Sequence, residues 1–198
     1  MTLTPQATDA LIVVDMQRDF MSGGPLAVRG AEDLVPGINA LLSRFETRVF
    51  TRDWHPADHI SFSPQPSFQD MSWPLHGVKD SPGAAFHPDL RVDLADRVVN
   101  KADRPDAEAY SGFQDTDLAA WLRKRGVQRV FVVGVASDYC VRFTALHALR
   151  EGFQVVVFED LVRAVDVPAG SGARALEELR AAGVRVSTLA EFDGHDPH

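Results

Sequence analysis

The only cysteine of the chain, Cys140, lies where nucleophilic chemistry is favoured. Residues 130–133 before it form an apolar, β-branched run that predicts a buried strand, and the residues after it have helical spacing up to Gly152. The first turn of a helix offers unpaired N–H groups and partial positive charge, which we expect to lower the thiol pKa and to hold an oxyanion. A lone buried cysteine is more often simple core packing, but this placement favours a nucleophile.

Two ionisable residues could serve this thiol. Asp15 ends the apolar run of residues 10–14, where burial would raise its pKa toward the range of a working general base. Lys101 follows a short predicted strand, residues 97–100, and could supply the counter-charge for a carboxylate and a forming thiolate. The ordinary alternatives are a helix cap or surface charge for Asp15 and a solvated lysine for Lys101. The pattern favours catalysis for Asp15 and leaves the role of Lys101 open.

A second group of residues has the composition of a metal site. Asp53 and His55 follow the predicted strand of residues 48–51 and share one side of an extended segment. His76 lies in the long loop beyond and could fold back to them, while His59 is a spare fourth candidate. Two histidines and a carboxylate are a common ligand set that leaves positions open for water or substrate. A D-x-H pair also arises by chance, so spacing alone is not decisive. The remaining histidines are interpreted as structural or surface residues: His87, His147, His195 and His198.

The elements that must position these residues follow one repeated pattern. Helix, glycine and strand recur at residues 123–133 (RKRGVQRVFVV), 148–158 (ALREGFQVVVF) and 179–189 (LRAAGVRVSTL). This alternation predicts a three-layer α/β/α sandwich with a mostly parallel sheet of about six strands and Rossmann-like topology, with residues 1–198 as a single domain. Ligands bind beyond the carboxyl ends of such strands. The four strand-end residues are expected to meet there: Asp15, Asp53, Lys101 and Cys140.

Composition narrows the class of protein. The chain has 198 residues, of which 45% are hydrophobic, as expected for a globular domain with a full core. The net charge is −8 and the basic residues are scattered, which argues against nucleic-acid binding. One cysteine excludes an internal disulfide framework and fits a reducing compartment. The apolar run near the N-terminus is too short to span a bilayer, so we expect a cytoplasmic protein with no membrane partner.

Several segments together resemble a known family. They are residues 11–20 (LIVVDMQRDF), 24–28 (GPLAV), 51–55 (TRDWH), 72–76 (SWPLH), 82–88 (PGAAFHP), 109–113 (AYSGF) and 134–142 (GVASDYCVR), with Lys101. The chain is similar in these segments to the nicotinamidases (pyrazinamidase type) of the isochorismatase-like cysteine hydrolase superfamily. Two departures are Gly77, where some relatives carry a second cysteine, and Arg18, where Asn is common.

The resemblance implies roles for individual residues. It implies a catalytic triad of Asp15, Lys101 and Cys140 and a cis peptide between Val135 and Ala136, so that the N–H groups of Ala136 and Cys140 form an oxyanion hole. It also implies one divalent metal ion that accepts a pyridine nitrogen; zinc is expected, with iron or manganese as alternatives. The implied ligands are Asp53, His55 and His76, with His59 as a further candidate. The implied substrate-binding residues are Phe20, Trp73, Tyr110 and Val135.

The implied reaction is the hydrolysis of nicotinamide to nicotinate and ammonia through a Cys140 thioester, as in NAD salvage. Nicotinamide is then the small-molecule partner, and a homo-oligomer stays open. One alternative is another amidase of the superfamily that acts on a different small carboxamide. A second alternative, from a different class, is a non-catalytic protein with a reactive thiol, for which Asp15 and Lys101 would be unnecessary.

Overall fold

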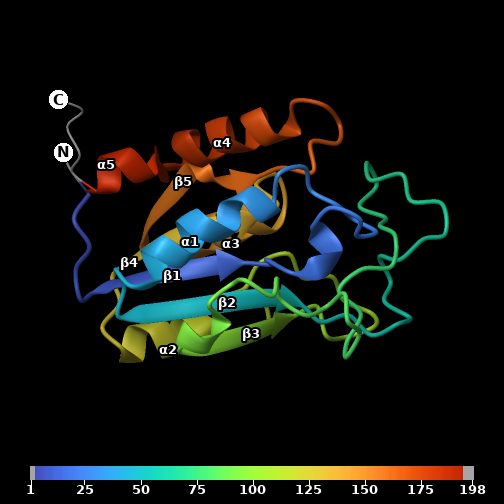
Figure 1. Cartoon of the computed structure of the whole chain (residues 1–198), viewed down its shortest axis with the longest axis horizontal. Helices are drawn as coiled ribbons and strands as arrows, with labels where there is room; N and C mark the ends of the chain where they lie inside the picture. Colours follow the sequence, from blue (N-terminus) through green and yellow to red (C-terminus); the bar gives the residue numbers. More distant parts are fainter. Residues whose placement is uncertain (1–2, 194–198) are drawn as a thin grey trace.

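The computed structural model describes residues 3–193 and is built around one six-stranded, all-parallel sheet (Figure 1). The strand order is β3-β2-β1-β4-β5-β6, so β1 and β4 lie at the centre. The strands are β1 (Asp9–Val14), β2 (Thr47–Asp53), β3 (Arg97–Lys101), β4 (Arg129–Val135), β5 (Gln154–Arg163) and β6 (Arg185–Ser187). The predicted parallel α/β sheet is therefore confirmed, with the order reversing between β1 and β4.

Helices cover both faces of this sheet. They are α1 (Val35–Leu42), α2 (Leu118–Lys124), α3 (Cys140–Arg150), α4 (Ser171–Ala182) and α5 (Leu189–Asp193), with short 3₁₀ turns η1 (Arg18–Phe20), η2 (Glu32–Leu34) and η3 (Val92–Leu94). Side chains alternate across each strand, so Leu11 and Val13 pack with α1 and α5 while Ile12 packs with α2, α3 and α4. Each such fully buried aliphatic side chain contributes about 1.5–3 kcal/mol before chain entropy is counted.

The two central strands approach each other closely at their carboxyl ends. Gly134 has φ +109°, and a Cβ atom there would lie 2.2 Å from the carbonyl oxygen of Val14. Only glycine fits this contact. The register of β4 against β5 also shifts between Val132 and Gly134. The residues that follow β1 and β4 are thus brought side by side.

The long segment between β2 and β3 is folded over the carboxyl edge of the sheet, at the right of Figure 1. Isolated bridges fix it at three places: Gln17 with Phe86, His55 with Val78 and Phe62 with Trp73. The segment, residues 56–94, is therefore held in place although it contains no α-helix and no strand.

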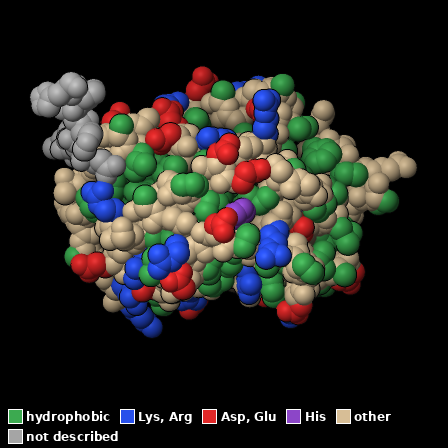
Figure 2. Space-filling view, in the orientation of Figure 1, with side chains coloured by type: hydrophobic (Ala, Val, Ile, Leu, Met, Phe, Trp, Pro, Cys, Tyr) green, Lys and Arg blue, Asp and Glu red, His purple; other side chains and the backbone are tan. Residues whose placement is uncertain are grey.

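The surface agrees with the scattered charge of the sequence. On the face shown in Figure 2, acidic and basic side chains are interspersed over the described residues. Within residues 3–193, no helix is both long and apolar enough to cross a membrane.

Candidate active site and metal centre

Asp15, Lys101 and Cys140 meet at the carboxyl edge of the sheet, although they come from three separate strand ends. Asp15 directly follows β1, Lys101 ends β3 and Cys140 begins α3. The Nζ of Lys101 lies 2.8 Å from Oδ2 of Asp15 and 3.3 Å from Sγ of Cys140. All three side chains are buried. The carboxylate, ammonium and thiol therefore form one cluster with little access to water.

The backbone and a neighbouring hydroxyl fix the Asp15 carboxylate. Asp15 adopts φ +49°, a left-handed conformation that Asp tolerates better than most residues, and the chain turns sharply there. The Thr51 hydroxyl donates a 2.7 Å hydrogen bond to Oδ1 of Asp15, and the Asp15 N–H donates to the Thr51 carbonyl at 3.1 Å. Oδ1 is thus occupied by Thr51, and Oδ2 faces the lysine. A carboxylate oxygen of Asp15 lies within 4.8 Å of the Cys140 sulfur.

Burial sets the protonation of this cluster. Desolvation raises the pKa of Asp15, although Lys101 partly offsets it. Desolvation would lower the pKa of Lys101, but Asp15, Asp53 and Cys140 outweigh it and raise that pKa well above its ordinary value. Lys101 therefore stays charged, while Asp15 becomes a stronger base than an exposed aspartate. This arrangement suits a carboxylate that accepts and returns a proton.

The expectation of a lowered thiol pKa is wrong in this structure. Desolvation raises the pKa of Cys140 well above its ordinary value, and the nearby charge of Lys101 only partly opposes it. The helix N-terminus is present as predicted, because Cys140 is the first residue of α3. The carboxylates of Asp15 and Asp53 add to the effect of burial. The thiol is therefore neutral at rest and needs a base, which Asp15 can supply.

The backbone beside Cys140 has the form that the resemblance implied. The peptide bond between Val135 and Ala136 is cis, so this prediction is confirmed. Among the residues that the structure describes, the N–H groups of Ala136 and Cys140 have no hydrogen-bond acceptor. Two free donors next to the sulfur can receive an oxyanion.

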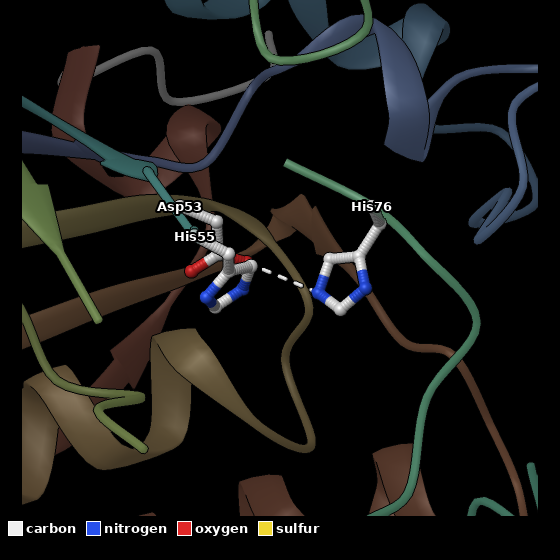
Figure 3. Close-up of side chains that lie close together, drawn as sticks. All are labelled: Asp53, His55 and His76. Atoms are coloured by element: carbon white, nitrogen blue, oxygen red, sulfur yellow. Dashed lines mark ion pairs between the residues drawn. The ribbon is translucent and has the colours of Figure 1, made fainter. Parts of the chain in front are cut away.

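A second cluster lies beside the first and consists of Asp53, His55 and His76 (Figure 3). Asp53 ends β2, His55 follows two residues later, and His76 reaches the site from the long loop. The Nε2 atoms of His55 and His76 lie 3.6 Å and 3.5 Å from Oδ2 of Asp53. One ligand atom from each residue falls within 4.8 Å of the others, and all three residues are buried. These distances suit one ion held between three ligands.

The hydrogen bonds of both histidines favour metal binding. The Nδ1 of His55 lies 3.2 Å from the Ala102 carbonyl, and that of His76 lies 2.8 Å from the Pro74 carbonyl. A carbonyl oxygen only accepts, so each Nδ1 carries the hydrogen and each Nε2 keeps a free lone pair. Both lone pairs face Oδ2 of Asp53. The three residues therefore offer two neutral imidazole nitrogens and a carboxylate oxygen, a ligand set that suits a divalent ion such as zinc.

The same aspartate joins the two clusters. Oδ1 of Asp53 accepts a hydrogen bond from Lys101, while Oδ2 faces the histidines. Desolvation alone would raise the pKa of Asp53, but chiefly the charge of Lys101 holds it well below its ordinary value. Asp53 is therefore ionised, as a metal ligand must be, and Lys101 is shared between the carboxylate of Asp15 in the thiol cluster and that of Asp53 in the candidate metal cluster.

His59 is placed differently from the other three candidates. It forms a separate group with His55 and Glu108. Its Nε2 donates to the Ala107 carbonyl at 3.2 Å, and its Nδ1 accepts from the Ser61 hydroxyl at 2.8 Å. Both ring nitrogens are thus occupied, and the ring packs against that of His55 with centroids 4.3 Å apart. In this arrangement His59 supports His55 rather than offering a lone pair. Among the other histidines, His195 and His198 lie outside the described residues.

A narrow pocket opens onto both clusters. Its lining includes three residues predicted to contact substrate, Phe20, Trp73 and Tyr110, and the predicted oxyanion-hole residue Ala136. Asp53, His76 and Cys140 of the two clusters also line it. Val135 is fully buried in the core and is not part of this lining, so its contact with substrate stays a prediction. The Trp73 indole N–H donates to the Tyr110 hydroxyl at 2.8 Å, which fixes both aromatic walls.

Other walls of the pocket were not predicted from the sequence: Leu26, Tyr139 and Val165. The buried carboxylate of Asp138 accepts from the N–H of Val165 at 3.0 Å and from the Ser171 hydroxyl at 2.6 Å. It therefore holds the loop between β5 and α4 against the pocket. Asp138 and Tyr139 directly precede Cys140 in the sequence, so their position could have indicated that they lie at the site. No feature of the sequence near Leu26 or Val165 indicates that these residues line the pocket.

Comparison with known protein families gives one model that spans most of the chain. The isochorismatase domain matches residues 9–191. Among curated relatives, the nicotinamidase/pyrazinamidase of Mycobacterium tuberculosis is 43% identical over 89% of this chain and 97% of its own length.

Solved structures give the same picture. The pyrazinamidase of Pyrococcus horikoshii in complex with zinc is 45% identical, with a TM-score of 0.81 over 92% of this chain and 99% of that chain. PnC1 of L. infantum in complex with nicotinate is 39% identical, with a TM-score of 0.87 over 97% of this chain and 98% of that one. The similarity thus covers both clusters and the pocket between them.

Proposed function

The chain belongs to the isochorismatase family, and we propose that it is a nicotinamidase, which hydrolyses nicotinamide to nicotinate and ammonia. The observation that carries this proposal is the position of Lys101. Its ammonium group contacts both Asp15 of the thiol cluster and Asp53 of the metal cluster, so nucleophile and ligand set face one pocket. Relatives named as nicotinamidases or pyrazinamidases support the same substrate class.

In the first half-reaction Asp15 accepts the Cys140 proton as the sulfur attacks the carboxamide carbon. The carbonyl π electrons move to oxygen, and the N–H groups of Ala136 and Cys140 stabilise the oxyanion. When the carbonyl re-forms, the C–N bond breaks and Asp15 returns the proton to the departing ammonia. A thioester on Cys140 remains. Lys101 keeps its charge throughout and stabilises the carboxylate and the forming thiolate.

The second half-reaction uses the same carboxylate in the same role. Asp15 removes a proton from water, the oxygen attacks the thioester carbon, and the C–S bond breaks with return of that proton to sulfur. The products are the neutral Cys140 thiol and nicotinic acid, which loses its proton to solvent to give nicotinate. The raised pKa of Asp15 suits both proton transfers. The carboxylate is a stronger base than that of an exposed aspartate, and the protonated carboxyl group can then donate the proton again.

Asp53, His55 and His76 are proposed to hold the divalent ion, most simply zinc, which the related P. horikoshii structure contains. When bound, the ion would supply a Lewis-acid site for the pyridine nitrogen and so orient the ring. Phe20, Trp73 and Tyr110 would contact the ring, and burial of the pocket would exclude bulk water from the thioester. A chain with a single, unpaired cysteine suits the reducing cytoplasm.

The test is ammonia release by the purified protein from nicotinamide, with metal content measured on the same sample. Benzamide and an aliphatic carboxamide serve as comparison substrates. We expect nicotinamide to be strongly preferred. Preference for the aliphatic amide would indicate a different amidase of the family, and absence of turnover on all three despite full metal occupancy would contradict the proposed function.

A further inference from the structure

The segment that follows β1 contacts both clusters through every second side chain. Asp15, Gln17 and Asp19 alternate along residues 15–19, which pair with residues 83–87 of the long loop. Asp15 lies in the thiol cluster, whereas Gln17 and Asp19 are not themselves part of the pocket lining. Their side chains instead end on the backbone of Asp53 and of Gly77, the residue after His76.

Gln17 binds the backbone of Asp53 as a neighbouring strand would. Its Oε1 accepts from the Asp53 N–H at 2.8 Å, and its Nε2 donates to the Asp53 carbonyl at 2.8 Å. The second Nε2 hydrogen goes to the Ala84 carbonyl at 2.9 Å. The side chain of Gln17 is fully buried. Because unpaired buried polar groups are costly, the two bonds to Asp53 fix the peptide groups on both sides of its Cα, and the third anchors Gln17 to the long loop.

Asp19 acts in the same way on the other side of the metal cluster. Its Oδ2 accepts from the Gly77 N–H at 2.8 Å, and Gly77 directly follows His76. The Gly77 carbonyl accepts from the His55 N–H at 2.9 Å. Gly77 also lies against Asp53, because a Cβ atom at Gly77 would be 2.6 Å from Cβ of Asp53. One carboxylate therefore fixes Gly77, a residue that is bonded to His76, accepts from His55 and lies against Asp53.

We propose that Gln17 and Asp19 are positioning residues for the metal site, which hold the backbones of Asp53 and His76 so that the three ligand atoms converge. The proposal rests on the metal site assigned above, but not on the identity of the amide substrate. Metal–ligand distances tolerate errors of only about 0.2 Å. Hydrogen bonds of Gln17 and Asp19 with the peptide groups of the ligand residues can hold the ligand atoms at such distances.

The test measures Zn²⁺ affinity by competition with a chromophoric chelator, together with circular dichroism and the Tm of the metal-free protein. Gln17→Met has similar length but loses all three bonds, and Gln17→Glu loses the two donated bonds. Asp19→Ala removes the acceptor for Gly77, whereas Asp19→Asn keeps one. We expect Gln17→Met and Asp19→Ala to weaken Zn²⁺ binding about 10–100-fold, as loss of outer partners does at other sites. Asp19→Asn should stay close to the parent value.

Asn39, which lies on α1, provides a matched control because its side chain binds the far end of the same loop. Its side chain donates to the Asp89 carbonyl at 2.8 Å and accepts from the Arg91 N–H at 2.9 Å, away from both clusters. Asn39→Leu should lower the Tm without changing Zn²⁺ affinity. If Gln17→Met does not fold, the Zn²⁺ affinities of Gln17→Glu and Asp19→Ala provide the test.

Folded variants of Gln17 and Asp19 with parental Zn²⁺ affinity and only a lower Tm would overturn the proposal and leave a purely structural role. A parent protein that binds Zn²⁺ but releases no ammonia from nicotinamide would contradict the proposed function and leave this proposal standing. A parent that binds no divalent ion would overturn the metal site and this proposal together.

Discussion

The Nζ of Lys101, the last residue of β3, lies 3.3 Å from the sulfur of Cys140, the first residue of α3. The contact is buried, so the ammonium charge is close to the position where negative charge would form on sulfur. Because the thiol is neutral at rest, this charge acts mainly during the reaction. The same ammonium contacts Asp15 and Asp53, so the protonation of Asp15 and the charge on Asp53 are linked through it.

Replacement of the nucleophile tests covalent catalysis. Cys140→Ala should fold, because Ala is a good helix former and is slightly smaller. The rate of ammonia release should fall by at least about 10³-fold, since the thioester cannot form. Nicotinamide binding and metal content should remain, as measured by calorimetry and metal analysis. Retained turnover by this variant would rule out a Cys140 thioester.

Asp15→Asn tests whether one carboxylate serves both half-reactions. Without the base, neither thioester formation nor thioester hydrolysis should proceed at a useful rate. Intact-protein mass spectrometry during turnover should then show no acyl adduct. Accumulation of an acyl-enzyme would mean that another group deprotonates Cys140 and that Asp15 is needed only for hydrolysis.

Thr51 gives a pH test of the base, because its hydroxyl donates to Oδ1 of Asp15. That bond favours the charged carboxylate, whereas burial favours the protonated form and raises the pKa. Activity requires the carboxylate, so it should be lost as pH falls through the Asp15 pKa. Thr51→Val keeps the shape but removes the hydroxyl, and the pKa should rise further.

The acid limb of kcat/KM should therefore move to higher pH in Thr51→Val and stay near the parent position in Thr51→Ser. At a pH on that limb, activity of the Val variant should be several-fold lower, and the difference should shrink at alkaline pH. The measurement is kcat/KM across pH for the three proteins. An equal loss at every pH would mean that Thr51 matters for packing and not for the proton affinity of Asp15.

His76→Ala tests what the metal site recognises. Loss of one of the three ligands should lower the metal affinity by more than the roughly 10–100-fold expected when a residue that only hydrogen-bonds to a ligand is lost. The kcat/KM for nicotinamide should fall sharply, whereas benzamide, which lacks the ring nitrogen, should be a poor substrate for the parent and lose proportionately less. His147→Ala is the control, since His147 lies on α3 outside both clusters and is partly exposed. Equal losses for the two amides would mean that the metal does not bind the ring.

The alternation of apolar runs with helical segments determined the architecture, because local periodicity is decided by which face each residue buries. It also placed Asp15, Asp53, Lys101 and Cys140 at one edge, since parallel strands all end on the same side of the sheet. The types of these residues, together with the short motifs around them, were sufficient to indicate both a nucleophilic site and a metal site.

Only the tertiary structure decided how these residues are oriented and protonated. Gln17 and Asp53 are 36 residues apart, and Asp19 and Gly77 are 58 apart, so no local pattern shows that they bind each other. The raised pKa of Cys140 likewise depends on the loops that bury it, which overcome the helix N-terminus that the sequence made visible. The physical reason is that desolvation and charge pairing depend on every segment packed around a group, whereas secondary structure depends mostly on its neighbours along the chain.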